Sequence, residues 1–370
     1  MKLAIVCSWL NQYGGAERVL EVLHAMYPEA PLYTSIYRPE ALPEAYRTWD
    51  IRPSFLNRLP LVSRLPQGFL PLFPLGFESM DLRDYDVVLS VTSAFGHGVI
   101  TPAETCHVCY CLTPTRFLWS YHSYIEREGL GRVARLVLPP FLSGLRQWDR
   151  HAADRVDRFV AISRTVQRRI AKYYRREAPI IYPPVRTEGA FVGAPPTEDP
   201  EGYFLVVSRL VPYKRIDLAV AAFTALGLPL RVIGTGRDRA ALEAMAGDNV
   251  AFLGYVSDEE VRRQMAHCRA LIFPGEEDFG LTPLEAMAAG RPVIAYRAGG
   301  ALDYVEEGVT GALFDTPDPS ALAEAVRRLD TYRFDPDVLR RHAERFSEAR
   351  FRQEMGAFLA DAVASRDLPA

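Results

Sequence analysis

The sequence lacks any apolar run of the roughly 18 to 20 residues that a membrane-spanning helix needs. It also lacks an even set of cysteines, because five in 370 residues do not suit a disulfide framework. Lys2 precedes a short apolar stretch, but Gly14 and Gly15 follow it without the small-residue pattern of a signal-peptide cleavage site. We therefore interpret residues 1–10 as containing a buried first strand and predict a cytoplasmic protein.

Two further shortages exclude particular sites. No G-x-G-x-x-G fingerprint is present, which argues against a nicotinamide dehydrogenase. Cys106, Cys109 and Cys111 surround His107, but no second Cys/His pair lies at ligand spacing elsewhere. We interpret these thiols as core cysteines and predict no metal and no other cofactor. The D-x-D pair Asp84 and Asp86 precedes a strand instead of ending one, so we interpret it as a charge pair at a strand edge.

The net charge of −3 conceals an uneven distribution. Residues 1–185 carry 22 basic and 17 acidic side chains, and the segment 116–176 alone carries 14 basic and 5 acidic ones. This segment also contains Phe117, Trp119 and the apolar stretch 136–145. Basic and aromatic groups together can hold a protein on the anionic inner face of a membrane. The alternative is a solvated, arginine-rich helical surface.

Strand and helix patterns alternate along the whole chain, which predicts an α/β protein with parallel sheets and helices on both faces. The expected helices include 15–26 and a last helix at about 347–365. The expected strands are Leu3–Cys7, Pro31–Tyr37, Asp86–Val91, His107–Leu112, Phe159–Ile162, Tyr203–Val207, Leu230–Ile233, Val250–Leu253, Ala270–Phe273 and Pro292–Ala295. The segment 52–77 has no clean periodicity and is expected to be irregular.

A stretch rich in proline, glycine and acidic residues at 180–202 marks the best domain boundary. We predict an N-terminal Rossmann-like domain at 1–185 and a C-terminal Rossmann-like domain at 186–346. A C-terminal helix in 347–370 is expected to return to the N-terminal domain. Closure about the linker is the expected motion.

The first chemical motif is a glycine turn after the first strand, Gly14-Gly15-Ala16-Glu17. Two glycines let the backbone approach a ligand closely, and the helix N-terminus that follows favours an anion. Many turns between a strand and a helix contain Gly-Gly for geometry alone, so this motif by itself decides little.

The second motif places two cations, Arg209 and Lys214, just after a predicted strand. Such a pair can hold a diphosphate, with Arg as a planar fork and Lys as a compact point charge. The chain has only three lysines among its 43 basic residues, so a lysine here indicates a need for a small charged donor. The alternative is a loop–helix junction with solvated charges.

The third motif, in residues 273–287, joins a strand end, an acidic glycine-containing loop and a helix. Backbone N–H groups at Phe279, Gly280 and Leu281 suit a pyrophosphate. Glu277 in the loop can reach a sugar hydroxyl, and Glu285 on the helix can accept hydrogen bonds from a ribose diol. Helix capping is the alternative role of these carboxylates.

Together these segments resemble the retaining family-4 glycosyltransferases of the GT-B fold. Glu277-x7-Glu285 within EDFGLTPLEAMAAGRPVIA resembles the family signature, and Arg209 and Lys214 stand where the family carries its phosphate-binding pair. The glycine motifs at 233–236, 253–255, 298–300 and 308–311 follow in family order. The resemblance implies two Rossmann-like domains facing across a cleft, with the donor bound mainly by the C-terminal one.

Residues 110–119 resemble a mannosyltransferase-like subgroup, with one departure. Leu112 stands where that subgroup carries a His in a C-H-T-P-type stretch, so a catalytic His at 112 is excluded. His97 is the nearest replacement, although a lone His beside a glycine is more often structural.

The resemblance implies a retaining transfer of a hexose from a nucleoside-diphosphate sugar to a hydroxyl acceptor. Arg209, Lys214 and Glu277 would be catalytic, and Gly14, Gly15, Phe279, Gly280, Leu281 and Glu285 would bind the donor. A GDP- or UDP-sugar is the expected donor, with mannose as the first choice of sugar, and no nucleic acid is expected as a partner. The acceptor would be a saccharide or a lipid-linked molecule in surface polysaccharide or glycolipid assembly.

Two other functions fit the same residues. A nucleotide-sugar-binding protein without transferase activity would use the same fold as a sensor or scaffold. A related transferase or phosphorylase that makes soluble sugars would have a similar donor site.

Overall fold

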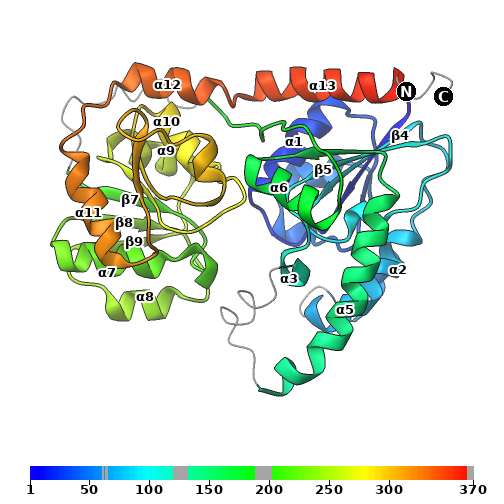
Figure 1. Ribbon diagram of the computed structural model, residues 1–370, viewed down its shortest axis with the longest axis horizontal. Coiled ribbons are helices and arrows are strands. Elements are labelled where there is room, and N and C mark those ends of the chain that lie inside the picture. The colour runs from blue at the N-terminus through cyan, green and yellow to red at the C-terminus, as the bar shows by residue number, and fades with distance from the viewer. Residues whose placement is uncertain (61, 63–65, 120–131, 188–201, 365–370) are drawn as a thin grey trace. The chain divides into compact units, whose positions relative to one another are not determined.

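The computed structural model describes residues 1–60, 62, 66–119, 132–187 and 202–364, with the side chains of 66–67 and 132–139 left aside. The chain divides into two compact units. Unit 1 comprises Met1–Tyr182 together with the C-terminal segment from Phe351, and unit 2 comprises Pro183–Arg350. Each unit is a sheet with helices on both faces (Figure 1). Within the described residues, none of the helices combines the length and apolar character needed to cross a lipid bilayer.

Unit 1 is built on a six-stranded parallel sheet in the order β3-β2-β1-β4-β5-β6. Its strands are β1 (Leu3–Cys7), β2 (Leu32–Thr34), β3 (Ile51–Pro53), β4 (Val87–Thr92), β5 (Cys106–Cys111) and β6 (Arg158–Ala161). The strands β1, β4 and β5 are buried along their whole length, which explains why they read as continuous apolar runs.

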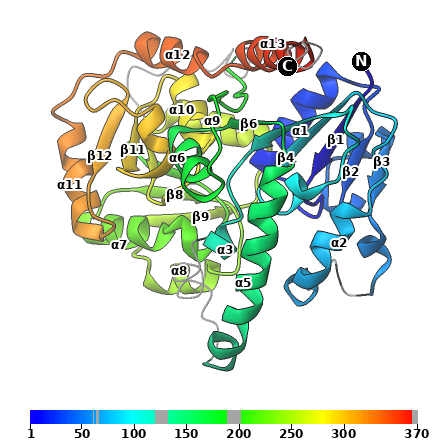
Figure 2. The ribbon, with the colours of Figure 1, turned by 45° about the vertical axis from the view of Figure 1, so that its right-hand side comes forward.

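The helices of unit 1 include those that join successive strands, as parallel pairing requires, and two that come after the last strand of its sheet. They are α1 (Gly15–Met26), α2 (Phe73–Glu78), α3 (Arg116–Trp119), α5 (Arg132–Asp154), α6 (Arg164–Tyr173) and α13 (Glu348–Ala364). Short 3-10 helices lie at η1 (Pro39–Ala41), η2 (Glu44–Thr48), η3 (Phe55–Arg58), η4 (Pro66–Leu72) and η5 (Gly96–Gly98). Figure 2 shows α5 as the long helix of this unit.

Unit 2 repeats the architecture with a second six-stranded parallel sheet, in the order β12-β11-β10-β7-β8-β9. Its strands are β7 (Phe204–Val207), β8 (Leu230–Ile233), β9 (Val250–Gly254), β10 (Leu271–Phe273), β11 (Val293–Tyr296) and β12 (Gly311–Phe314). Its helices are α7 (Ile216–Leu226), α8 (Arg239–Met245), α9 (Asp258–His267), α10 (Thr282–Ala288), α11 (Pro319–Leu329) and α12 (Pro336–Glu344), with 3-10 turns η6 (Pro212–Lys214) and η7 (Gly299–Asp303).

The core of unit 2 shows why the chain folds this way. Phe223 on α7 and Leu322 on α11 pack on the strand residues Phe204 and Val232, all of them buried. Side-chain caps fix several helix starts: Asp318, for example, accepts backbone hydrogen bonds from Ser320 and Ala321 at the N-terminus of α11.

The two-domain Rossmann-like α/β class predicted from the sequence is confirmed, with two corrections to the strands. β3 was not expected because it is a three-residue edge strand that is largely exposed and contains Pro53. β12, which starts at Gly311, was not among the expected strands. β3 is set by pairing with its neighbour and not by its own apolar pattern, whereas all four residues of β12 are buried.

The last helix crosses the boundary between the units, since the division falls between Arg350 and Phe351 within α13. Its later part packs on unit 1: the Phe351 ring meets Tyr110 edge-on at 5.7 Å, and Arg158 Nη1 pairs with Asp361 at 2.7 Å. The segment 188–201, which contains most of the predicted linker, lies outside the described residues.

Candidate functional site

The strand order of unit 2 creates one place where neighbouring strands lead to connections running in opposite directions. β7 and β10 are neighbours, but β7 continues toward β8 on one side and β10 toward β11 on the other. In open α/β sheets, ligands bind beyond the carboxyl ends of strands at such a switch point. The loops after β7 and β10 are those that carry the second and third sequence motifs.

The loop after β7 holds both predicted cations. Arg209 Nη2 donates to the Tyr213 hydroxyl at 2.7 Å, which ties the start of the loop to its end. Arg215 closes the loop in the left-handed region, at φ 54°, and its side chain pairs with Asp217 at 3.0 Å. This tight turn places Lys214 at the end of η6, directly before α7 begins.

Lys214 and Glu277 join the two loops through an ion pair between Nζ and Oε1. The Lys214 side chain is 14% exposed and that of Glu277 18%, so the pair is largely shielded but open at one side. Lys214 Nζ also lies 5.3 Å from the centre of the Tyr213 ring. The sequence placed the two groups in one site but did not foresee that they pair. Either charge left alone in such surroundings would be costly, so each holds the other in place.

Glycines allow the loops to approach one another. A Cβ on Gly275 would lie 2.7 Å from the Lys214 carbonyl oxygen, and one on Gly299 would overlap the Glu277 carbonyl. Gly299 also has φ 65°, and the N–H of Gly300 donates to the Glu277 carbonyl at 2.8 Å. The loop carrying Glu277 is therefore held from both sides by backbone that only glycine permits.

The side chain of Phe279 is buried, which is compatible with the backbone role that the sequence predicts for this residue. Its side chain is 4% exposed and meets Tyr304 edge-on at 5.5 Å, so only its backbone can face a ligand. The Tyr304 hydroxyl donates to the Phe279 carbonyl at 2.7 Å. Burial raises the pKa of Tyr304 well above its ordinary value, so the hydroxyl keeps its proton. Sequence reasoning missed Tyr304, because no motif marks it.

Gly280 turns the chain into the helix that follows. Its φ of 89° is left-handed, and a Cβ there would lie 2.5 Å from the Phe273 ring and 3.0 Å from the Tyr304 hydroxyl. Leu281 precedes α10, and Glu285 lies in the first turn of that helix, half-buried. The loop thus presents backbone and a carboxylate at the same sheet edge as Arg209 and Lys214.

The glycine turn of unit 1 lies at the equivalent edge of its own sheet. Gly14 is the residue before α1, with extended backbone that any residue adopts. A Cβ there would meet only Glu17 Oε2, at an ordinary 3.5 Å. Packing within unit 1 therefore does not require a glycine at 14.

Three other sequence features of unit 1 lie elsewhere. His97 is 2% exposed and buried beside Trp148 and Tyr174, so its ring does not reach a surface where it could take over from the absent His at Leu112. Asp86 accepts from the backbone N–H of Lys2 at 2.6 Å, at the edge where strands begin. All five cysteines are buried, as expected of core thiols, and burial raises the pKa of Cys7 and Cys268 to about 12.

Two family models match the chain. The model of glycosyltransferase family 4 matches residues 13–188, and that of glycosyl transferases group 1 matches residues 192–348. Between them they cover the motifs of both units.

Three curated relatives give partial alignments. An uncharacterized glycosyltransferase of Methanocaldococcus jannaschii is 28% identical over 52% of this chain and 55% of its own. The D-rhamnosyltransferase WbpZ of Pseudomonas aeruginosa is 31% identical over 41% of each chain. The alpha-1,3/1,6-mannosyltransferase ALG2 of Dictyostelium discoideum is 26% identical over 55% of this chain and 57% of its own. The chain thus spans about half the length of the curated relatives it matches.

Solved structures are similar over nearly the whole chain. A protein of Anabaena, Alr3699/HepE, solved in complex with UDP, has a TM-score of 0.69 at 18% identity, covering 98% of this chain and all of that one. A sucrose-phosphate synthase of Thermosynechococcus elongatus has a TM-score of 0.75 at 17% identity, covering 99% and 100%. These likenesses concern the fold. With the family models and the motif order, they show that the chain belongs to the family-4 glycosyltransferases of the GT-B fold.

Proposed function

We propose that the protein is a retaining transferase that moves a hexose, with mannose as the first candidate, from a nucleoside-diphosphate sugar to a hydroxyl acceptor. The observation that carries the proposal is the gathering of Arg209, Lys214 and Glu277 at the switch point of unit 2. Cations and backbone N–H groups there suit the two phosphates, and carboxylates suit the hydroxyls of the sugar and the ribose.

The chemistry asks these residues to stabilise a leaving group. As the bond from the anomeric carbon to the diphosphate oxygen breaks, negative charge grows on that oxygen. Arg209, Lys214 and the backbone at 279–281 would stabilise it, while the acceptor oxygen bonds to the anomeric carbon on the same face of the sugar and its proton passes to the departing diphosphate. The ion pair between Lys214 and Glu277 places both groups at one point of the sheet edge, and a donor would replace this pairing with contacts to its phosphate and its sugar.

The choice of mannose follows the resemblance of residues 110–119 and the mannosyltransferase among the curated relatives. GDP is the nucleotide that corresponds to this choice of sugar. UDP is the alternative, since the Anabaena structure was solved in complex with UDP. A lipid-linked acceptor and peripheral attachment to the inner face of a membrane would suit the basic segment 116–176, of which 120–131 lie outside the described residues.

A binding panel followed by a transfer assay tests the proposal. Thermal shifts with UDP, GDP, ADP and dTDP sugars identify the donor, and GDP-mannose is expected to give the largest shift. Incubation with the labelled donor and sugar or lipid acceptors should then release nucleoside diphosphate and yield a product of unchanged anomeric configuration, read by NMR. Donor binding without transfer to any acceptor would favour a non-catalytic binding protein, and an inverted product would exclude the retaining mechanism.

Glu285 offers a separate test of the donor orientation. We expect Glu285→Ala to weaken nucleotide binding about tenfold by calorimetry, because a ribose diol would lose a charged hydrogen-bond acceptor. Glu243→Ala is the matched control, since Glu243 pairs with Arg239 on the surface of α8. Equal affinities in the two variants would contradict the ribose role.

A further inference from the structure

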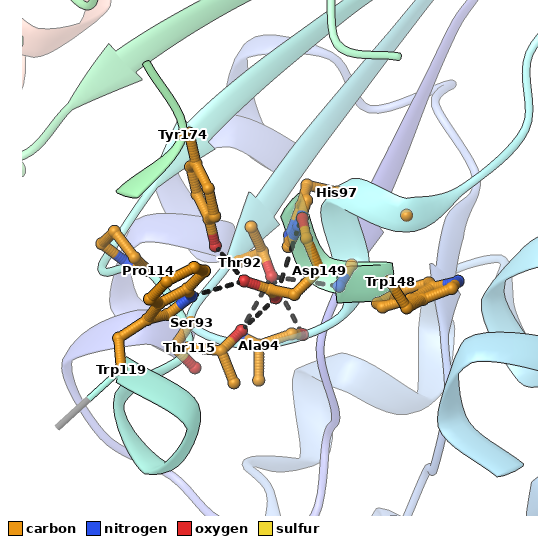
Figure 3. Close-up of polar contacts among 12 residues, drawn as sticks. Thr92, Ser93, Ala94, His97, Pro114, Thr115, Trp119, Trp148, Asp149 and Tyr174 are labelled. Carbon is orange, nitrogen blue, oxygen red and sulfur yellow. Dashed lines mark hydrogen bonds and ion pairs between the residues drawn. The ribbon is translucent and has the colours of Figure 1, made fainter. Parts of the chain in front are cut away.

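Unit 1 contains a sealed carboxylate that the proposed function does not use. Asp149 lies on α5 and is 0% exposed. Removing a carboxylate from water is costly unless hydrogen bonds replace the lost solvation. Figure 3 shows the side chains that surround it, which come from segments far apart in the sequence.

Three donors satisfy the Asp149 carboxylate. The Thr115 hydroxyl donates to Oδ1 at 2.7 Å, and the Trp119 indole N–H donates to Oδ2 at 2.7 Å. The Tyr174 hydroxyl donates to Oδ2 at 2.9 Å from the end of α6. His97 completes the surroundings, with Nε2 at 3.5 Å from Oδ1 and 3.2 Å from the Asp149 carbonyl oxygen. Charge-assisted bonds of this kind are about twice as strong as neutral ones.

Two of these donors bracket a single turn of chain. Thr115 precedes α3 and Trp119 ends it, so Asp149 holds the residues Arg116–Leu118 at both ends. Arg146, one turn earlier on α5, donates from Nε to the Leu118 carbonyl at 2.6 Å. Trp119 also stacks on Tyr173 at 4.7 Å. Helix α5 therefore fixes the position of α3 through two charged side chains.

The segment held in this way lies at the carboxyl edge of the sheet of unit 1. Residues 112–119 follow β5, and β5 pairs with β4, whose own loop leads to η5. The hydroxyl of Thr92, the last residue of β4, shares a hydrogen bond of 3.1 Å with the hydroxyl of Ser8, which directly follows β1. The segment thus adjoins the switch point of unit 1, between β1 and β4, as the donor loops adjoin that of unit 2.

A buried ionic centre is a poor source of stability, because apolar residues of similar volume often stabilise a core equally well. The best-attested role of a buried ionic group is to specify one arrangement of the surrounding chain among several possible ones. A carboxylate with two donors from one short turn gives that turn a fixed orientation.

We propose that Asp149 is a positioning residue that holds Arg116 and Phe117 as a wall of the acceptor-binding surface. The proposal rests on the proposed transferase function. Asp149 itself touches no substrate and acts through Thr115 and Trp119.

Matched variants that each remove one donor from the same carboxylate test the proposal. Thr115→Val and Trp119→Phe release the α3 side, whereas Tyr174→Phe removes a hydrogen bond of similar length from the α6 side. The kinetic readout is the acceptor KM with GDP-mannose or whichever donor proves active. We expect Thr115→Val and Trp119→Phe to raise it by at least about fivefold, and Tyr174→Phe by less than about twofold. The donor KM should stay within about twofold of the wild-type value in all three variants. Thr115→Ser, which keeps the hydroxyl, should have the wild-type acceptor KM.

Hydrogen exchange of the backbone at 113–119 supplies a readout that needs no activity. We expect faster exchange in Thr115→Val and Trp119→Phe and unchanged exchange in Tyr174→Phe, with thermal melting confirming that all three fold. Equal effects of the three variants on exchange or on the acceptor KM would show general support of the core and overturn the positioning role. Faster hydrogen exchange together with an unchanged acceptor KM would contradict the claim that this segment forms part of the acceptor-binding surface. An absence of any transfer by the wild-type protein would instead count against the proposed function, while the exchange result would still decide whether Asp149 holds the segment.

Discussion

The two units use charge in opposite ways at equivalent edges of similar sheets. In unit 2 the Lys214–Glu277 pair is largely shielded but remains open to a ligand, at 14% and 18% exposure. In unit 1 the Asp149 carboxylate is fully sealed and accepts from three side chains of the protein itself. A charge that a ligand can reach can exchange its protein partner for that ligand, whereas a sealed charge can serve only the shape of the protein.

The scaffold does not explain this contrast, because both sheets have the same strand order when counted from their own first strand. The difference lies in the loops. Unit 2 brings three loops together through Gly275, Gly299 and Gly300, which leaves little side-chain bulk around the ion pair. Unit 1 surrounds Asp149 with Trp119 and Tyr174, which exclude water.

The largest expected effect comes from removing the accessible cations. Lys214→Ala and Arg209→Ala should each lower kcat about 100-fold, roughly 3 kcal/mol of transition-state stabilisation, because charge on the departing diphosphate would lose a partner. Lys172→Ala, at an exposed position of α6, is the control and should retain the wild-type rate. Near wild-type turnover of a folded Lys214 or Arg209 variant would contradict a catalytic role for the accessible charges of unit 2, and with it their contrast with the buried Asp149.

The close approach of the loops in unit 2 can be broken by a single methyl group. Gly300→Ala would bring a Cβ within 2.6 Å of the Phe279 carbonyl oxygen and push the loop that carries Glu277. We expect a loss of about 2 kcal/mol in nucleotide binding, measured by calorimetry, as for other overpacked positions. Gly144→Ala on α5 meets nothing within 4 Å and should leave binding unchanged. A Gly300→Ala protein with wild-type affinity would show that nucleotide binding does not depend on the position of the loop that carries Glu277.

Acid should weaken the buried interior of unit 1. Burial, with smaller effects of His97 and Arg155, lowers the pKa of His107 from 6.5 to about 3. Between pH 6.5 and about 3, His107 is protonated in the unfolded chain but neutral in the folded one. Its contribution to stability is therefore complete above about pH 6.5 and falls as the pH drops toward 3. From about pH 7.5 to 5.5 this residue alone should cost about 1.4 kcal/mol.

Urea unfolding of the wild-type protein and of His107→Gln at the two pH values measures this contribution. The variant should lose less stability on acidification than the wild type, by about the same 1.4 kcal/mol. His342, whose pKa is also lowered by burial, acts in the same direction in both proteins and cancels in the comparison. Identical slopes for the two proteins would mean that His107 titrates normally.

The smallest expected effect tests the hydroxyl that supports the donor loop. Tyr304→Phe removes the hydrogen bond to the Phe279 carbonyl and should weaken nucleotide binding by about 1 kcal/mol, roughly fivefold. Tyr332→Phe loses an exposed hydrogen bond to Glu307 in the same unit and should leave affinity unchanged. If the two variants behave alike, the buried hydroxyl has no part in shaping the loop.

Much of the fold could be predicted because its signals are local. Buried parallel strands such as β1 and β4 appear as apolar runs, and α1 and α13 appear as periodic patterns, so their positions follow from the residues themselves. The edge strand β3 escaped prediction because pairing with a neighbour, and not its own pattern, makes it a strand. β12 was missed although all four of its residues are buried.

The sequence by itself determined which chemical groups stand after which strands: Arg209 and Lys214 after β7, and Glu277 before α10. Only the tertiary structure decided that Lys214 pairs with Glu277, that the Phe279 side chain turns inward, and that Asp149 meets Thr115 from 34 positions away. Local periodicity specifies an element and its buried face, but contacts between distant residues depend on the order of strands in the sheet. That order is a property of the whole packed domain, and no short stretch of sequence contains it.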